Sequence, residues 1–348
     1  MTQTTESFFS LPSLVAAAIV IALNLYVLLG GADFGGGVWD LLASGPRRER
    51  QRALIADAIA PIWEANHVWL ILVVVLLFTA YPSAFALLTT VLHIPLTLML
   101  LGIVLRGSAF TFRSYDSRRD AVQRRWGRIF AIASTVTPLL LGMIVGAIAS
   151  GTVRQPPRDG SSSFADVFIR SWLSPFTLGI GLLALALFAF LAAVYLTVEA
   201  KDDQLREDFR LRALAAAFAV FAIASTDLVL AGVGAPRIWS ALTTGTLALL
   251  LHLATGVAAV VALWALWSRR FSMARIAAAA QVSFILWGWA LGQFPYLVPP
   301  DVTISGAAAP RVTLALLVGA LLLGLAVLIP SLRYLFRVFK GEQKAKTV

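Results

Sequence analysis

Apolar stretches of membrane-spanning length recur along the whole chain, and they leave few folds open to it. A helix needs about 20 apolar residues to cross roughly 30 Å of hydrocarbon. Nine stretches approach that length, at Leu11–Leu29, Leu54–Ala80, Ala84–Leu105, Ile129–Ala149, Pro175–Val198, Leu211–Ala231, Ala241–Trp267, Ile276–Leu291 and Val312–Ile329. Hydrophobic residues make up 59% of the 348 residues and charged residues only 13%, a balance that soluble cores do not reach. We therefore expect an all-α polytopic membrane protein that forms a single membrane domain over residues 1–348.

Basic residues predict the orientation of these spans. Twenty-three of the 28 Lys and Arg residues lie in the odd-numbered connections and the C-terminal tail, and five lie in the even-numbered connections. Basic residues favour the cytoplasmic side of a membrane, so we expect the N-terminus outside and the C-terminus in the cytoplasm. The same bias explains the net charge of +10 as membrane topology, without any need for nucleic-acid binding.

Several classes of site are absent from the sequence. The chain has no cysteine, which excludes a disulfide framework, a zinc ribbon and a thiolate-bound iron–sulfur cluster. It has no Walker, Gly-x-Gly-x-x-Gly or HExxH motif, so it has no visible ATPase, dinucleotide-binding or metalloprotease apparatus. The first ten residues lack the basic region of a cleaved signal peptide, so we expect the first apolar stretch to be kept as a span.

Polar residues gather where the second span begins, in Pro61-Ile-Trp-Glu-Ala-Asn-His-Val-Trp69. Asp57, Glu64 and His67 stand seven and three residues apart, a spacing that places them on one face of a continuous helix. Ionisable groups are costly in hydrocarbon and usually mark a functional path, so we interpret them as a proton-conducting or proton-storing site. A polar seam that fixes helix packing is the alternative. Three further side chains lie beside this face: Trp63, Asn66 and Trp69.

A single acid, Asp33, stands within the glycine-rich end of the first span, Gly30–Gly37. Antiparallel neighbouring spans could bring Asp33 and Glu64 together in the cytoplasmic half of the membrane. The alternative is that Asp33 only caps a helical segment. Two other charged residues are less informative: we expect Arg106 to be an interfacial anchor that snorkels to the cytoplasm, and Asp227 to join a polar path or face the exterior.

The chain has three histidines, at 67, 93 and 252. His93 and His252 lie on different spans and could in principle clamp a haem, although a lone membrane histidine is more often a packing residue. Glu64-x-x-His67 is half of a di-iron bundle signature. Because the second half is missing, we expect no metal site in this chain.

Five segments in order resemble subunit II of the cytochrome bd-type quinol oxidases. Pro61-Ile-Trp-Glu-Ala-Asn-His-Val-Trp-Leu70 is similar to that family's Pro-x-Trp-Asp-Gly-Asn-Glu/Gln-Val-Trp-Leu and is the most specific match. Gly31-Ala-Asp-Phe-Gly35 resembles the family's Gly-Phe-Asp-x-Gly, and Arg106-Gly-Ser-Ala-Phe-Thr-Phe-Arg113 resembles its Arg-Gly-x-Ala-Phe-Glu-Phe-Arg. The segments that begin at Ala193 and Gln293 resemble the ends of its fifth and eighth helices.

The resemblance implies a fold and a function. It implies nine transmembrane helices arranged as two four-helix bundles plus one peripheral helix, paired with a homologous subunit I in a heterodimer. Haem b, haem d and the quinol site would belong to subunit I, and this chain alone would bind no cofactor. The complex would oxidise quinol and reduce oxygen to water with cytoplasmic protons, without proton pumping, in the bacterial cytoplasmic (inner) membrane. The family also leaves room for a small single-span subunit, and for contacts with lipid and quinone.

The same resemblance suggests roles for individual residues. Glu64 and Asp33 match the acids of the family's second and first helices, and they would serve a proton route toward the partner. Trp63, Asn66 and Trp69 would line that helix, with Trp69 near oxygen access. The chain departs from the family pattern at three positions, carrying Glu64 in place of Asp, His67 in place of Glu or Gln, and Gly30 where some members have a second acid. A proton-coupled transporter, or a haem-binding cytochrome that uses His93 and His252, are the alternative functions.

Overall fold

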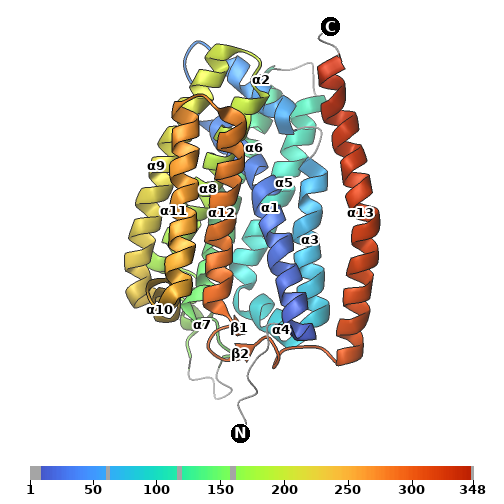
Figure 1. The fold of residues 1–348 in the computed structure, drawn as a ribbon, viewed down its shortest axis with the longest axis vertical. Coiled ribbons are helices and arrows are strands. Elements are labelled where there is room, and N and C mark those ends of the chain that lie inside the picture. The colour runs from blue at the N-terminus through green and yellow to red at the C-terminus, as the bar shows by residue number, and fades with distance from the viewer. Residues whose placement is uncertain (1–8, 60–62, 116–119, 157–161, 346–348) are drawn as a thin grey trace.

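The protein is almost entirely helical in a computed structural model that describes residues 9–59, 63–115, 120–156 and 162–345. The helices are α1 (Leu11–Leu41), α2 (Arg48–Ile59), α3 (Trp63–Ala80), α4 (Pro82–Val91), α5 (His93–Tyr115), α6 (Asp120–Ser150), α7 (Phe164–Phe168), α8 (Pro175–Glu199), α9 (Asp203–Gly234), α10 (Pro236–Thr243), α11 (Gly245–Trp267), α12 (Phe271–Gln293) and α13 (Arg311–Ala345). Two short strands, β1 (Tyr296–Val298) and β2 (Val302–Thr303), pair antiparallel. The long helices run side by side along one direction, and the strands lie at one end of the bundle (Figure 1).

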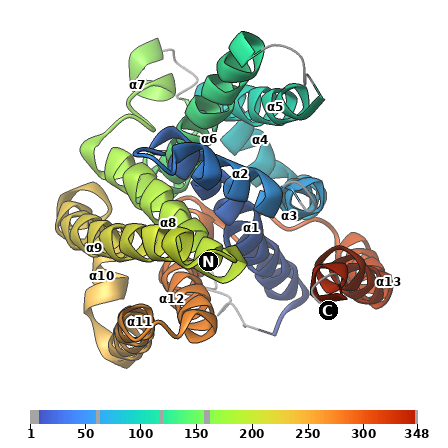
Figure 2. The ribbon, with the colours of Figure 1, turned by 90° about the horizontal axis from the view of Figure 1, so that it is seen from above.

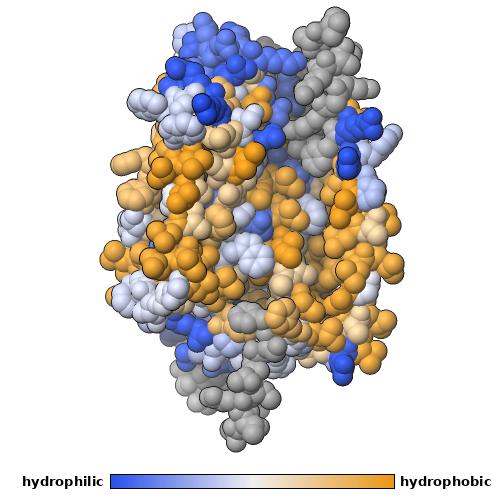
Figure 3. Space-filling model, in the orientation of Figure 1, coloured by the Kyte–Doolittle hydropathy of each residue, from blue (hydrophilic) through white to orange (hydrophobic). Residues whose placement is uncertain are grey.

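Within the described residues, eight helices are long and apolar enough to cross a membrane, and α2 with α3 makes a ninth if the pair is one broken span. The exposed surface agrees with a membrane protein, because apolar side chains cover its middle and polar ones gather toward its ends (Figure 3). Phe218 is 73% exposed and Val233 is 91% exposed, both on α9. Such side chains are stable in lipid rather than in water.

Three predicted spans are divided in the structure. The span predicted over residues 241–267 begins in α10 and continues in α11 after a break at Thr244. The span predicted over residues 54–80 is divided into α2 and α3, whose axes meet at 55°. Residues 60–62, which include Pro61 between the two helices, lie outside the described part of the chain. The span predicted over residues 84–105 is divided at Leu92, so that the short α4 precedes α5. Pro95 in the first turn of α5 explains the division at Leu92, because proline suits the start of a helix and cannot donate a backbone hydrogen bond within it.

The helices gather around α8, which packs against α1, α6, α9 and α12. On one side of it α1, α3, α5 and α6 lie together, and on the other α9, α11 and α12 do (Figure 2). Helix α8 begins with a capping box, in which Ser174 and Thr177 each accept a hydrogen bond from the other's backbone N–H. Gly35 permits the close contact of α1 with α8, because a Cβ at this position would lie 1.9 Å from the carbonyl oxygen of Phe188.

Helix α13 stands apart from the rest of the molecule (Figures 1 and 2). Only 6% of its spanning window is buried, compared with 61% for α8. Its contacts run mainly along α1, with a few to α3.

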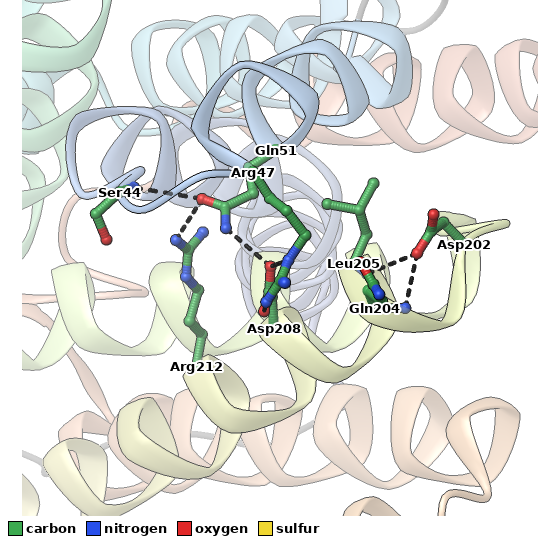
Figure 4. Close-up of polar contacts among 8 residues, drawn as sticks. All are labelled: Ser44, Arg47, Gln51, Asp202, Gln204, Leu205, Asp208 and Arg212. Carbon is green, nitrogen blue, oxygen red and sulfur yellow. Dashed lines mark hydrogen bonds and ion pairs between the residues drawn. The ribbon is translucent and has the colours of Figure 1, made fainter.

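Helix α2 is fixed across one end of the bundle by a charged network (Figure 4). Arg47 donates two hydrogen bonds to Asp208 of α9, at 2.6 and 2.8 Å. Gln51, which is buried, donates to Asp208 at 2.9 Å and accepts from Arg212 at 2.7 Å. Asp202 caps the start of α9 by accepting from the backbone N–H groups of residues 204 and 205, and it also pairs with Arg50. These contacts place α2 over the cytoplasmic end of α8 and α9 in the predicted topology.

Candidate functional site

The centre of the candidate site is a buried hydrogen bond between α1 and α3. The Nδ2 atom of Asn66 donates to Oδ2 of Asp33 at 2.7 Å. Both side chains are almost fully enclosed, with Asp33 5% exposed and Asn66 2% exposed. Helix α1 continues for eight residues beyond Asp33, so Asp33 lies in a helix interior and does not cap a segment. A carboxylate that accepts from an amide in this setting can hold or release a proton without contact with bulk water.

Glu64 lies on a different side of α3 from this hydrogen bond. Its side chain is exposed, and it lines a hollow of about 540 Å³ between α3 and α5, which we call the α3–α5 hollow. The residues that share this hollow with Glu64 are His67, Ile103, Val104, Gly107, Ser108, Thr111 and Phe112. Asp33 and Glu64 therefore lie on adjacent helices, but they do not line the same hollow.

Arg106 connects the α3–α5 hollow to the buried core. The sequence predicts a snorkelling anchor, but the structure buries this side chain to 2% exposure. Its guanidinium lies 4.5 Å from the ring centroid of Phe34 and 5.5 Å from that of Phe130, and its Nη1 atom lies 3.3 Å from Nε2 of His67. The Nε and Nη2 atoms have no hydrogen-bond partner among the described residues. The aromatic faces explain the burial, because a guanidinium stacks on aromatic rings more readily than an ammonium group does.

His67 is held between these groups and the first helix. Its ring centroid lies 6.0 Å from that of Tyr26 and 5.8 Å from that of Phe34. The guanidinium of Arg106 lies next to this imidazole, with Nη1 of Arg106 and Nε2 of His67 3.3 Å apart. The site therefore contains one fixed cation, one buried acid and one acid in an open hollow.

The other predicted site residues lie in three settings. Asp57 is exposed on α2, and because α2 and α3 meet at 55°, no single helix face carries Asp57, Glu64 and His67 together. Trp69 is buried at 7% exposure in the main core. The side chain of Trp63 lies outside the part of the structure that is described.

Comparison with known proteins identifies the family. Residues 11–339 match the family model for cytochrome bd terminal oxidase subunit II. The chain belongs to this family.

Relatives and a solved structure agree with membership in the subunit II family. The chain is 22% identical over 343 residues to a putative cytochrome bd menaquinol oxidase subunit II of Bacillus subtilis, covering 96% of this chain and 97% of the relative. It is 31% identical over 127 residues to cytochrome bd-I ubiquinol oxidase subunit 2 of Escherichia coli, covering 36% of this chain and 32% of that protein. The fold is similar to that of a chain in the bd oxidase structure of Geobacillus thermodenitrificans, with a TM-score of 0.74, 21% identity and coverage of 94% of this chain and 98% of that one.

Membership in the subunit II family establishes the general function. The chain is a multi-pass membrane subunit of a quinol oxidase complex and has a subunit I partner. This finding confirms the predicted family and favours the oxidase over the proton-coupled transporter. The roles of single residues are not part of the family match.

The histidines of this subunit II do not form a haem clamp. His93 lies at the start of α5 and its Nδ1 atom is 2.9 Å from the Thr90 carbonyl oxygen. His252 lies on α11, with its Nδ1 atom 2.8 Å from the Ala248 carbonyl oxygen. These two helices lie on opposite sides of the molecule (Figure 2). Over the described ranges, no group of three His, Cys, Asp or Glu side chains could hold a metal ion.

Asp227 of α9 is buried between α9 and α8, so it does not face the exterior. It is 4% exposed, and neither carboxylate oxygen has a hydrogen-bond partner in the described part of the chain. Gly179 of α8 makes room for it, because a Cβ at residue 179 would lie 1.9 Å from its Oδ1 atom. Burial of a carboxyl group without a hydrogen-bond partner carries a desolvation cost.

Proposed function

We propose that this subunit II carries protons from the cytoplasmic side of the membrane to its subunit I partner, through Asp33 and Glu64. In this proposal, the electrons of quinol reduce oxygen to water at the haems of subunit I. His93 and His252 lie on helices at opposite sides of the molecule and do not form a haem clamp (Figure 2). In this proposal, the contribution of this chain is to hold protons, to move them and to stabilise the partner. The observation that carries the proposal is the buried 2.7 Å hydrogen bond between Asp33 and Asn66, which lies two residues along α3 from the exposed Glu64.

The surroundings of Glu64 support a partner at this face. Val68 is 47% exposed, Ile71 is 61% exposed and Val104 is 55% exposed, all on the same α3–α5 side as Glu64. A carboxylate among such side chains would meet lipid in the isolated subunit, which is costly. A protein surface that covers the α3–α5 hollow removes this cost, and subunit I is the partner that membership in the family implies.

The direction of transfer rests on the distribution of basic residues. The end of the bundle that carries α2, Arg47 and Arg50 is basic and is the cytoplasmic end in the proposed orientation. Asp33 and Glu64 both lie toward this end, so protons need cross only part of the membrane thickness to reach them. A role of Trp63 and Trp69 in oxygen access rests on the family resemblance alone and is part of the same proposal.

The test is Glu64→Gln in the assembled oxidase with its partner. The amide keeps the size of the side chain but cannot transfer a proton, and a positioned proton-transfer group typically contributes about a hundredfold or more to a rate. We expect oxygen consumption to fall while the haem spectrum of the complex stays normal. Glu49→Gln is the matched control, since Glu49 is an 81% exposed acid on α2. Wild-type oxygen consumption in Glu64→Gln would show that Glu64 has only a packing role at this face.

A further inference from the structure

A second cavity reaches Asp33 from the opposite side of α3. It has a volume of about 460 Å³ and is enclosed by α1, α2, α3, α8 and α12; we call it the α8–α12 chamber. Asp33 and Asn66 form part of its wall, whereas Glu64 does not line it. The buried end of the candidate site therefore has its own cavity, separate from the α3–α5 hollow.

Polar side chains connect this chamber to the predicted cytoplasmic end of the bundle. Ala192, Tyr195 and Glu199 line it from one face of α8, three and four residues apart. Seven residues of helix separate Ala192 from Glu199, which corresponds to about 10 Å along the axis. Glu199 is the last residue of α8, and Arg275, in the first turns of α12, lines the same chamber.

The chamber is closed on one side and more exposed on another, and the exposed side is its mouth. Helix α2 closes one side with Ile55, Ala58 and Ile59, and the charged network of Arg47, Gln51, Asp208 and Arg212 holds α2 in place (Figure 4). The α12 side is open by comparison, because Arg275 is exposed and Ile276 is 71% exposed. The mouth therefore lies beside Glu199 and Arg275.

The chemistry of the lining favours water as the occupant. An apolar cavity of this size would stay dry, but buried water is stable where it has several polar partners. The chamber offers two carboxyl groups, an amide, a phenol and a guanidinium, from Asp33, Glu199, Asn66, Tyr195 and Arg275. At about 30 Å³ per molecule, its volume has room for on the order of ten waters.

We propose that the α8–α12 chamber is the cytoplasmic proton inlet of this subunit II and that Glu199 is its first proton acceptor. A proton from solution binds the Glu199 carboxylate, passes to chamber water and then to the Asp33 carboxylate, which regenerates ionised Glu199. No electrons move and no other reactant is needed. Asp33, Tyr195 and Arg275 are the other titratable or charged groups that line the chamber. This inference rests on the proposed role of Asp33 as a proton carrier.

Proton uptake by the assembled, pre-reduced oxidase after addition of oxygen tests the inlet. We expect Glu199→Gln to slow uptake by about tenfold, less than the roughly hundredfold loss of a missing proton-transfer group, because water alone still reaches Asp33. The slowing should increase as the pH rises, since fewer protons are then available to enter without an acceptor. Glu199→Asp should recover most of the rate. Glu49→Gln, the exposed acid on α2, should leave uptake unchanged.

A second variant blocks the chamber without removing a charge. Ala279 of α12 is half-buried and lines the chamber, so Ala279→Phe should slow uptake while Ala279→Ser should not. Wild-type uptake in both Glu199→Gln and Ala279→Phe would overturn the inlet. If Glu199→Gln fails to assemble, Ala279→Phe decides alone.

The two proposals fail in different ways. Slow uptake in Glu64→Gln with wild-type uptake in Glu199→Gln and Ala279→Phe would keep the proposed function and overturn the chamber. Slow uptake in Glu199→Gln with wild-type uptake in Glu64→Gln would support the chamber and contradict the proposed role of Glu64.

Discussion

At the scale of single residues, Arg106 shows where sequence reasoning reaches its limit. An arginine at the end of an apolar stretch predicts a side chain that snorkels to the interface. Its actual burial depends on Phe34 of α1 and Phe130 of α6, which only the packing of three helices brings together. By contrast, the pairing of α1 with α3 near Asp33 was predictable, because one acid among glycines and one polar cluster occur on successive spans. The sequence did not predict that Asn66 is the hydrogen-bond partner of Asp33.

The stacking of Arg106 predicts a difference between arginine and lysine. Arg106→Lys keeps the charge but loses the planar stacking on the two rings, which is part of a desolvated cation–π interaction worth about 2 kcal/mol. We expect a lower melting temperature for the purified complex than with Arg128→Lys, an exposed arginine on α6. Equal melting temperatures would mean that the charge alone is needed at residue 106.

At the scale of secondary structure, hydropathy predicted the long helices but not the breaks within them. The helices α8, α9, α11 and α12 lie where apolar stretches were predicted, because long apolar runs have few stable alternatives in lipid. The division between α2 and α3 was missed, since a window of mean hydropathy passes over a single proline. This mattered for the candidate site: the predicted common face of Asp57, Glu64 and His67 assumed one straight helix.

The start of α9 predicts a pH dependence of stability. Hydrogen bonds from the Leu205 N–H and from Arg50 hold the pKa of Asp202 below its usual value of 3.8. A lowered pKa in the folded state means that the charged cap stabilises the protein above the usual value, and that this contribution disappears as the pH falls through the lowered pKa. Asp202→Ser keeps a capping oxygen without a charge.

Melting temperatures at neutral and at strongly acidic pH measure this effect. The wild type should lose more stability than Asp202→Ser between the two conditions, because only the wild type loses a charged cap. An identical loss in both proteins would show that other carboxyl groups account for the acid sensitivity.

At the scale of the whole molecule, the exposed α3–α5 face is the surface that we expect subunit I to cover. It carries an acid among apolar side chains, whereas the exposed face of α9 carries Phe218, Phe221 and Val229 and suits lipid. The sequence indicated a partner through the family resemblance. The sequence could not indicate which face meets this partner, because the exposed side of each helix depends on how the helices pack together.

Photocrosslinking from single positions tests this difference between the faces. A photoreactive amino acid at Ile71, which is 61% exposed on α3, should crosslink to subunit I in the assembled complex. The same group at Phe218, which is 73% exposed on α9, should crosslink to lipid only. Crosslinks to subunit I from residue 218 and not from residue 71 would move the partner to the other side of the bundle.

Proton uptake by the assembled oxidase with Asp33→Asn is the most direct test of Asp33 as a buried proton carrier. Asparagine can still accept the hydrogen bond from Asn66, so we expect normal assembly and haem content. Proton uptake and oxygen reduction should slow together, by about a hundredfold if no other group replaces the carboxylate. Wild-type uptake in this variant, with the complex intact, would contradict the account.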